Sequence, residues 1–260
     1  MRVALYQIDA FSSKVFAGNP AAICPLERWL DDAAMQAIAA ENNLAETAFF
    51  VPEGKDFGLR WFTPAAEVEL CGHATLASGW LLLNKLQPTR DSVTFQTRSG
   101  TLTVSRDGKR MVMDFPSRPP EPVAPCAGLL EALGAKPIAV LASRDYLVVY
   151  DDAETVRRLQ PDLAGIAKAD RFAVIVTAPG DNGYDCVSRF FAPARGVPED
   201  PVTGSAHCTI VPYWAKQLGK TDIFCRQASP RGGDLYCQDR GERVILAGDC
   251  AFYMQATIEI

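Results

Sequence analysis

Two carboxylates stand in sequence surroundings that suit proton transfer. Glu46 opens an apolar, strand-like run, with Leu44 before it and Phe49 after it. Apolar surroundings raise the pKa of a carboxyl group toward the neutral value that a general base or acid needs. Asp200 lies in a Glu-Asp-Pro segment in the second half of the chain. We therefore treat Glu46 and Asp200 as candidate catalytic carboxylates, although a charged residue at a strand start is also a common surface feature.

Two glycine-containing turns, residues 71–73 and 203–205, lead directly into predicted helices. Unpaired N–H groups and the helix dipole favour anions at a helix N-terminus. Gly72, Gly204 and Ser205 are thus candidate substrate-binding residues, with ordinary helix starts as the alternative. His73 lies where the dipole lowers the pKa of an imidazole, so a neutral ring there can donate a hydrogen bond to a substrate. We treat His73 as a third candidate catalytic residue, with a structural histidine as the alternative.

Several common sites are missing from the sequence. Its two histidines, His73 and His207, are too few for a histidine-based metal site, and its eight cysteines include no Cys-x-x-Cys pair. The sequence has neither a phosphate-binding loop nor a Gly-x-Gly-x-x-Gly stretch. The residues around Ser205 lack the Gly-x-Ser-x-Gly pattern of a serine hydrolase. We therefore expect no metal ion and no nucleotide, nicotinamide or flavin cofactor.

The elements that position these residues repeat once along the chain. Residues 60–64, Arg-Trp-Phe-Thr-Pro, recur as residues 189–193, Arg-Phe-Phe-Ala-Pro, about half a chain later. Proline continues neither a helix nor a central strand, so the proline-rich residues 116–125 are expected to link the two copies. Three further segments of the first half match segments of the second half in the same order: residues 48–51 with 173–176, residues 71–74 with 203–206, and the hairpin series around 107–110 with 239–243. We therefore predict two equivalent lobes.

Each lobe is predicted to wrap strands around one helix. Residues 73–83 are apolar on nearly every side, so a helix there must be buried all round. The counterpart of this helix in the second lobe is predicted at residues 206–218, where Gly219 stops the helix. The expected fold is α+β, with two pseudo-symmetric lobes, each a curved, mostly antiparallel sheet around a central helix. Strands are expected in the first lobe at residues 3–9, 46–51, 58–62, 92–97, 101–106 and 110–115, with a further helix from residue 31 or 32 to about residue 42.

We place the N-terminal lobe at residues 1–117 and the C-terminal lobe at residues 118–260. The final strand, about residues 252–260, is able to complete the sheet of either lobe.

Composition narrows the class of protein. The chain has 260 residues and a net charge of −5, which argues against nucleic-acid binding because nucleic-acid binders carry basic surfaces. Its longest apolar stretch, residues 74–83, is far shorter than the roughly 20 residues that span a bilayer. No signal-peptide pattern opens the sequence, and a chain of this size needs no disulfides. We expect a cytoplasmic protein with reduced thiols and no membrane partner.

The motifs resemble those of the phenazine-biosynthesis isomerase family, the PhzF-like proteins. The resemblance covers residues 16 to 207 in order, and the duplication covers the rest. It rests on five segments: 16–21 (Phe-Ala-Gly-Asn-Pro-Ala), 43–49 (Asn-Leu-Ala-Glu-Thr-Ala-Phe), 60–64 (Arg-Trp-Phe-Thr-Pro), 69–75 (Glu-Leu-Cys-Gly-His-Ala-Thr) and 199–207 (Glu-Asp-Pro-Val-Thr-Gly-Ser-Ala-His).

The resemblance implies the diaminopimelate epimerase fold, with the site between the two lobes. It also implies isomerisation by proton transfer without a cofactor, and a homodimer. The proton-shuttling glutamate of the family falls on Glu46 here. Its site histidine, aspartate and serine fall on His73, Asp200 and Ser205. The expected function is a cofactor-independent isomerase of a small carboxylate substrate.

Two other functions remain open. The epimerases of this fold use two opposed cysteines, and this chain keeps Cys71 but has Thr203 at the second position. A threonine hydroxyl is far too weak an acid to replace a thiol, so a cysteine-type racemase is disfavoured. The other alternative is a non-catalytic protein that binds a small carboxylate.

Overall fold

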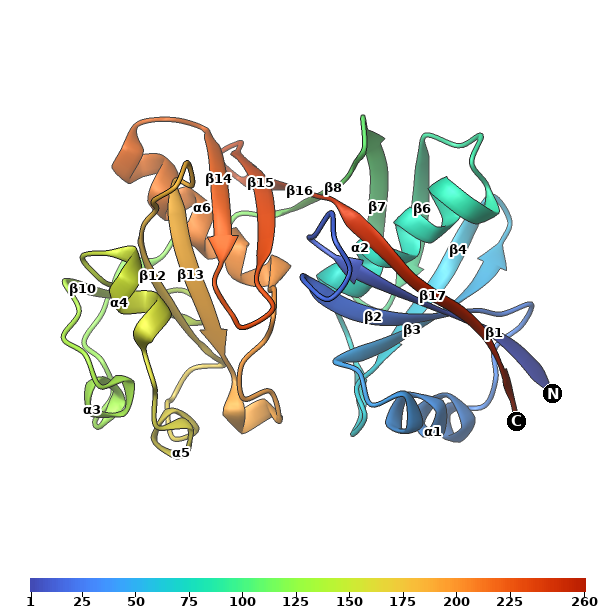
Figure 1. Ribbon diagram of the computed structural model, residues 1–260, viewed down its shortest axis with the longest axis horizontal. Coiled ribbons are helices and arrows are strands. Elements are labelled where there is room, and N and C mark those ends of the chain that lie inside the picture. The colour runs from blue at the N-terminus through green and yellow to red at the C-terminus, as the bar shows by residue number, and fades with distance from the viewer. The chain divides into compact units, whose positions relative to one another are not determined.

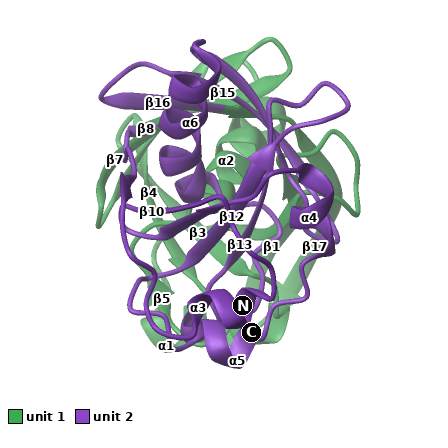
Figure 2. Cartoon of the chain, turned by 90° about the vertical axis from the view of Figure 1, so that its left-hand side faces the viewer, with its two compact units in different colours: residues 1–114, 247–260 green, residues 115–246 purple.

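The computed structural model describes residues 1–260, which form two compact units. Unit 1 comprises residues 1–114 and 247–260, and unit 2 comprises residues 115–246 (Figure 2). The last strand, β17 (Cys250–Glu259), pairs antiparallel with the first, β1 (Arg2–Ala10). The two chain ends therefore lie together in unit 1, where Arg2 is opposite Glu259 (Figure 1).

Unit 1 is a mostly antiparallel sheet with two helices. Its strands follow the order β17-β1-β2-β3-β4-β6-β7-β8, and only the pairs β2–β3 and β4–β6 are parallel. The short strand β5 (Glu67–Val68) pairs with β4. The remaining elements are β2 (Asn19–Pro25), α1 (Asp32–Asn42), β3 (Glu46–Glu53), β4 (Asp56–Phe62), α2 (Gly72–Leu81), the π-helical turn η1 (Leu82–Leu86), β6 (Ser92–Thr97), β7 (Gly100–Asp107) and β8 (Arg110–Pro116), whose last two residues belong to unit 2.

The central helix of unit 1 is α2, which lies against β1, β2, β3, β7 and β17 (Figure 1). Every residue from His73 to Gly79 is buried. A Cβ atom built on Gly79 would lie 2.5 Å from a methyl carbon of Val104 on β7, so only glycine permits this close approach of helix and sheet. The other face of the sheet is covered by α1, whose Met35, Ile38 and Ala39 pack in one apolar cluster with residues of β1, β2 and β3.

Unit 2 repeats this plan. Its sheet follows the order β9-β10-β11-β12-β13-β14-β15-β16, with parallel pairs only at β11–β12 and β13–β14. Its elements are β9 (Glu121–Pro122), α3 (Leu129–Leu133), β10 (Ala139–Ala142), β11 (Tyr146–Val149), α4 (Ala153–Arg158), α5 (Leu163–Ile166), β12 (Val174–Pro179), β13 (Cys186–Phe191), the 3-10 turn η2 (Pro193–Arg195), α6 (Gly204–Leu218), β14 (Asp222–Gln227), β15 (Gly233–Asp239) and β16 (Arg243–Gly248), whose last two residues belong to unit 1.

Both faces of the unit 2 sheet are covered. On one face, Val174 and Val176 of β12 pack in an apolar cluster with α3, α4 and α5. On the other face, the indole N–H of Trp214 on α6 donates a hydrogen bond of 2.9 Å to the hydroxyl of Thr177. Strands covered on both sides read as nearly continuous apolar runs, which is the pattern of β11 and most of β12.

The duplicated Arg-x-Phe motif has the same contacts in both units. Arg60 on β4 forms a two-bond ion pair with Glu67 at 2.7 and 2.8 Å, and its guanidinium lies 5.2 Å from the ring of Phe62. Arg189 on β13 forms the same kind of pair with Glu199 at 2.7 and 2.9 Å, and its guanidinium lies 4.9 Å from the ring of the phenylalanine two residues later. The duplication predicted from the sequence is therefore a duplication of structure.

The main elements predicted for unit 1 are present, and two strands, β2 and the two-residue β5, were not predicted. In the structure β2 pairs with both β1 and β3 and is almost wholly buried. No helix is both long and apolar enough to cross a membrane.

Candidate functional site

Glu46 is the first residue of β3 and follows the turn that ends α1. The turn is made by Asn43, a left-handed residue with φ of 48° whose N–H bonds back to the carbonyl of Ala39. The parallel pairing of β2 with β3 begins at Glu46, opposite Ala21. The Glu46 side chain is 18% exposed, so its carboxylate is half-buried at the end of the sheet.

His73 lies in the first turn of α2, and its ring faces this carboxylate. The distance from His73 Nε2 to Glu46 Oε2 is 3.3 Å, close enough for the two groups to share a proton. Burial lowers the pKa of His73 to about 3, because the charged form of the imidazole loses its hydration. The ring is therefore neutral at physiological pH, and the cause is burial rather than the helix dipole considered from the sequence.

The second ring nitrogen of His73 contacts a thiol. Cys71 Sγ lies 3.5 Å from His73 Nδ1, so the imidazole stands between the thiol on one side and the Glu46 carboxylate on the other. Each of these three residues offers one atom that is able to bind a metal ion, and the three atoms all lie within 4.8 Å of one another. An imidazole binds one metal ion through one nitrogen, and here its two nitrogens face different partners. The imidazole thus stands between a thiol and a carboxylate, each of which faces a different ring nitrogen.

The two central helices begin without side-chain caps. Cys71 precedes α2 and Thr203 precedes α6, and neither side chain accepts a hydrogen bond from its helix. The other longer helices are capped in the usual way, as α1 is by Asp31 and α4 by Asp152. Both central helices therefore begin with N–H groups that no cap satisfies, and these N–H groups belong to the glycine turns singled out from the sequence.

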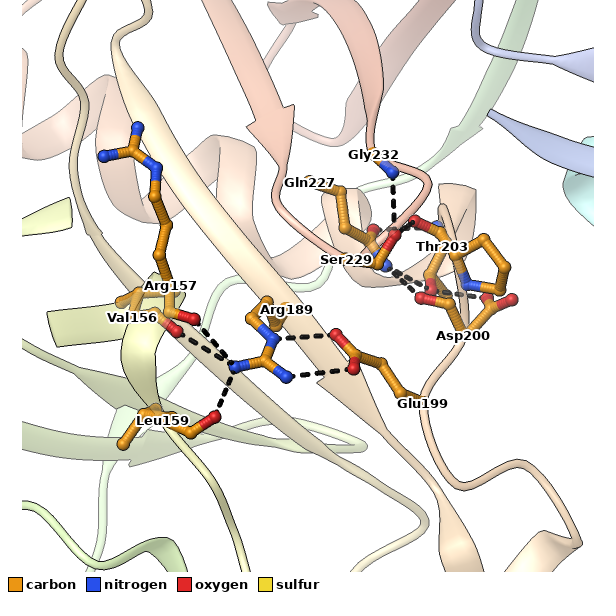
Figure 3. Close-up of polar contacts among 11 residues, drawn as sticks. Val156, Arg157, Leu159, Arg189, Glu199, Asp200, Thr203, Gln227, Ser229 and Gly232 are labelled. Atoms are coloured by element: carbon orange, nitrogen blue, oxygen red, sulfur yellow. Dashed lines mark hydrogen bonds and ion pairs between the residues drawn. The ribbon is translucent and has the colours of Figure 1, made fainter. Parts of the chain in front are cut away.

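Figure 3 shows how unit 2 holds the loop before α6. Arg189 is 7% exposed and donates two hydrogen bonds to the carboxylate of Glu199. A third nitrogen, Nη1, donates to the carbonyl of Leu159 at 2.8 Å and to that of Val156 at 3.2 Å. One buried guanidinium thereby ties the start of the loop to the end of α4, which fixes where the next residue, Asp200, can lie.

Asp200 is held by a compact network. The Thr203 hydroxyl donates a hydrogen bond of 2.5 Å to Asp200 Oδ2. Gln227, at the end of β14, donates through Nε2 to the backbone carbonyl of Asp200 at 2.8 Å and accepts from the Thr203 N–H at 2.8 Å. The Ser229 hydroxyl donates to the carbonyl of Pro201 at 2.8 Å (Figure 3). The carboxylate of Asp200 thus has a fixed orientation at the N-terminus of α6.

The six candidate residues fall into two groups, one in each unit. Unit 1 brings Glu46 and His73 into contact and places Gly72 at the first position of α2. Unit 2 places Asp200 next to Thr203, at the start of α6. The half-buried Ser205 and the buried Gly204 form the first turn of that helix.

Sequence reasoning missed two residues in these groups. Cys71 was not among the six candidate residues, but its sulfur faces the ring of His73. The sequence spacing of Cys71 and His73 was the available signal. Gln227 was not singled out at all, and nothing in its local sequence distinguishes it from other polar strand residues.

Comparisons of sequence and of structure with known proteins point to the same family. A family model described as phenazine biosynthesis-like protein matches residues 8–256. An uncharacterised isomerase of Pseudomonas aeruginosa is 52% identical over 260 residues, with the whole of both chains covered. The crystal structure of a PhzF-family phenazine biosynthesis protein of Enterococcus faecalis superposes with a TM-score of 0.97 at 42% identity, also over the whole of both chains.

A more distant likeness concerns the fold alone. A probable proline racemase of Agrobacterium radiobacter superposes with a TM-score of 0.64 at 10% identity, covering 99% of this chain and 93% of the racemase. The predicted α+β fold of two similar lobes, each with a sheet around a central helix in the manner of the epimerases, is confirmed.

Proposed function

The chain belongs to the phenazine biosynthesis-like family and is an isomerase, and from that premise we propose that it moves a proton within a small carboxylate substrate, with Glu46 as the group that removes and returns the proton. The observation that carries this proposal is the contact of 3.3 Å between the Glu46 carboxylate and the buried, neutral ring of His73. No cofactor takes part in the proposed reaction.

A neutral His73 directs the chemistry to Glu46. With the Cys71 thiol donating to Nδ1, the ring proton is placed on Nε2, which faces Glu46 Oε2 at 3.3 Å. Proton exchange with the substrate is then directed to the other oxygen, Oε1. Glu46 takes a proton from a carbon atom of the substrate, and the electron pair of that C–H bond shifts into the conjugated π system of the substrate. The same proton then returns to a second carbon atom on the same face of the substrate. Atoms and charges balance, because the substrate and product are isomers.

The remaining residues are proposed to bind the substrate. The uncapped N–H groups at Gly72 in unit 1 and at Gly204 and Ser205 in unit 2 suit the oxygens of a carboxylate group. Asp200 is proposed to accept a hydrogen bond from a hydroxyl or amino group of the substrate and to assist the proton transfer. The support for this role is the fixed orientation that Thr203 and Gln227 give to Asp200.

A two-cysteine racemase is the weaker alternative. At the position that corresponds to Cys71, unit 2 has Thr203, and its hydroxyl already donates to Asp200 at 2.5 Å. A hydroxyl in that role has no proton-accepting function toward a substrate carbon. Assembly as a homodimer and a cytoplasmic location stay predictions from the sequence.

Proton exchange in deuterated water tests the proposal. Small cyclic and amino carboxylates, among them trans-2,3-dihydro-3-hydroxyanthranilate, are incubated with the wild type, with Glu46→Gln and with Glu53→Gln, and deuterium incorporation at carbon is followed by NMR. Glu53 is exposed at the far end of the same strand and is the matched control. We expect exchange with the wild type and the control, and a loss of about 100- to 10,000-fold with Glu46→Gln.

Three outcomes would contradict this proposal. Equal exchange by Glu46→Gln and the wild type would mean that another group is the base. Binding of a carboxylate without exchange, at equal affinity in wild type and Glu46→Gln, would favour a non-catalytic binding protein. No binding or exchange by the wild type with any member of the panel would reject the substrate class.

A further inference from the structure

Unit 2 gathers arginines around one aromatic ring, that of Phe172. The guanidinium carbon of Arg144 lies 3.6 Å from the ring centroid of Phe172, and that of Arg195 lies 4.9 Å from the same centroid. Arg144 is in the turn between β10 and β11, Phe172 comes just before β12, and Arg195 ends η2. Three separate segments thus bring two guanidinium groups to one ring, which is itself 36% exposed.

A third arginine belongs to the same cluster. The backbone N–H of Arg118 donates to the carbonyl of Cys208 at 2.8 Å, which holds this linker residue against α6. The Nη1 atom of Arg118 is buried and has no hydrogen-bond partner. Burial lowers the pKa of Arg144, and the charges of Arg118 and Arg195 act on it in the same direction. The three positive charges are therefore close enough to repel one another.

One carboxylate lies among these arginines. Asp145 is 1% exposed, and its Oδ1 is 3.7 Å from Arg144 Nε, too long for a strong charge-assisted hydrogen bond. The charge of Arg118 also acts on this carboxylate and, like that of Arg144, lowers the pKa of Asp145 against the effect of burial. Three guanidinium groups and one carboxylate leave two positive charges without a counter-charge.

Three other arginines of the chain are each compensated by a carboxylate. Arg60 pairs with Glu67 at 2.7 Å, Arg189 pairs with Glu199 at 2.7 Å, and Arg226 pairs with Asp234 at 2.8 Å. Each of these guanidinium groups has a carboxylate at close contact. A partly buried cluster of unpaired positive charges costs free energy, and an anion bound among the charges offsets that cost.

We propose that Arg118, Arg144 and Arg195 form a binding site for a doubly charged oxyanion, such as inorganic phosphate or the phosphoryl group of a small metabolite. The planar guanidinium fork matches the spacing of phosphate oxygens. Phe172 keeps the Arg144 and Arg195 groups in place by cation–π contact. Arg171 supports the turn, because its Nη1 donates to the carbonyl of Ser143 at 2.8 Å. This site is independent of the proposed proton transfer at Glu46.

An NMR titration with inorganic phosphate tests the proposal. Labelled wild-type protein is titrated at constant ionic strength, with sodium chloride replaced stepwise by phosphate. We expect saturable amide shifts at Asp145, Phe172 and Arg195. A parallel titration with a phosphorylated small molecule, glycerol phosphate, distinguishes the two sources of the group: equal affinity means that the free anion is sufficient, and tighter binding of the ester means that a metabolite is the better ligand.

Two variants and a matched control locate the site. Arg195→Gln and Arg144→Gln are expected to weaken phosphate binding at least tenfold. Arg195 is exposed, so its substitution is compatible with folding, which thermal unfolding verifies. Arg158→Gln is the control: this arginine is 80% exposed, pairs with Glu154 on its own helix, and is expected to leave binding unchanged.

Three results would overturn the proposal. The first is the absence of saturable shifts in the wild type. The second is a set of shifts confined to the first turns of α2 and α6, around Gly72 and Gly204, which would place the anion at the helix N-termini. The third is undiminished binding by both Arg144→Gln and Arg195→Gln.

Discussion

His73 Nε2 and Glu46 Oε2 lie 3.3 Å apart although the residues belong to different elements, the first turn of α2 and the first residue of β3. The ring of His73 is buried against the sheet and the Glu46 carboxylate is half-buried. A buried histidine is a weak base, since burial lowers the pKa of His73 to about 3. The His73 ring therefore stays neutral beside Glu46 at physiological pH.

The buried ring of His73 makes stability depend on pH. In the unfolded chain a histidine has a pKa of about 6.5, and in the folded protein the pKa of His73 is about 3. Between these values the unfolded chain binds a proton that the folded protein does not bind. The free energy of unfolding therefore falls as the pH is lowered from 6.5 toward 3, by at most about 1.4 kcal/mol per pH unit from this group.

The measurement is denaturant unfolding of the wild type and of His73→Gln across this range. The difference between the two slopes isolates His73 from the other titrating groups. We expect the wild type to lose more stability than the variant as the pH falls, and parallel curves would show that His73 is protonated in the folded protein.

Substitution of Cys71 separates a positioning residue from a catalytic base. If the thiol only donates to Nδ1 of His73, serine is able to replace it, and Cys71→Ser should keep most of the exchange activity. Cys71→Ala removes the donor and should reduce activity by about two- to tenfold, the effect of one neutral hydrogen bond. Nitrogen NMR shifts of the imidazole should show the proton on Nε2 in the wild type and in Cys71→Ser, and a mixture of tautomers in Cys71→Ala. Complete inactivity of a folded Cys71→Ser would instead support a cysteine-type racemase.

The Thr203 hydroxyl should stabilise the loop that carries Asp200. Thr203→Val keeps the shape but removes the donor of the 2.5 Å hydrogen bond to the carboxylate. Because the acceptor is charged, we expect a loss of about 1.5–3 kcal/mol in the free energy of unfolding. Thr203→Ser keeps the hydroxyl and should be close to the wild type in chemical denaturation. Equal losses in both variants would assign the effect to packing of the methyl group.

Gly79 should be irreplaceable in the central helix of unit 1. Alanine is a better helix former than glycine, yet its Cβ would lie 2.5–2.8 Å from three carbons of Val104. Overpacking of a rigid valine should cost about 1–3 kcal/mol in thermal or chemical unfolding. The double variant Gly79→Ala with Val104→Ala should recover part of that loss relative to Val104→Ala alone. A more stable Gly79→Ala single variant would show that β7 moves away at little cost.

Local sequence determined the secondary-structure plan of this protein. The all-apolar run of α2 requires a helix buried on every side, a signal that lies in neighbouring residues. The recurrence of the Arg-x-Phe motif half a chain later indicated a duplicated fold. The uncapped glycine turns before α2 and α6 were visible for the same reason. Strand β2 was not predicted, and its pairing with β1 and β3 is a property of the whole sheet rather than of its local sequence.

Only the tertiary structure decided which side chains meet. The contact of Glu46 with His73 depends on the register of β3 and on the place of α2 against the sheet, and neither can be read from the two local sequences. Gln227 reaches Asp200 from the end of another strand, and Arg118, Arg144 and Arg195 converge from three distant segments. Spacing in the sequence fixes distances only within one helix or strand, whereas packing of the sheet fixes them between elements, and the chemistry of this protein lies between elements.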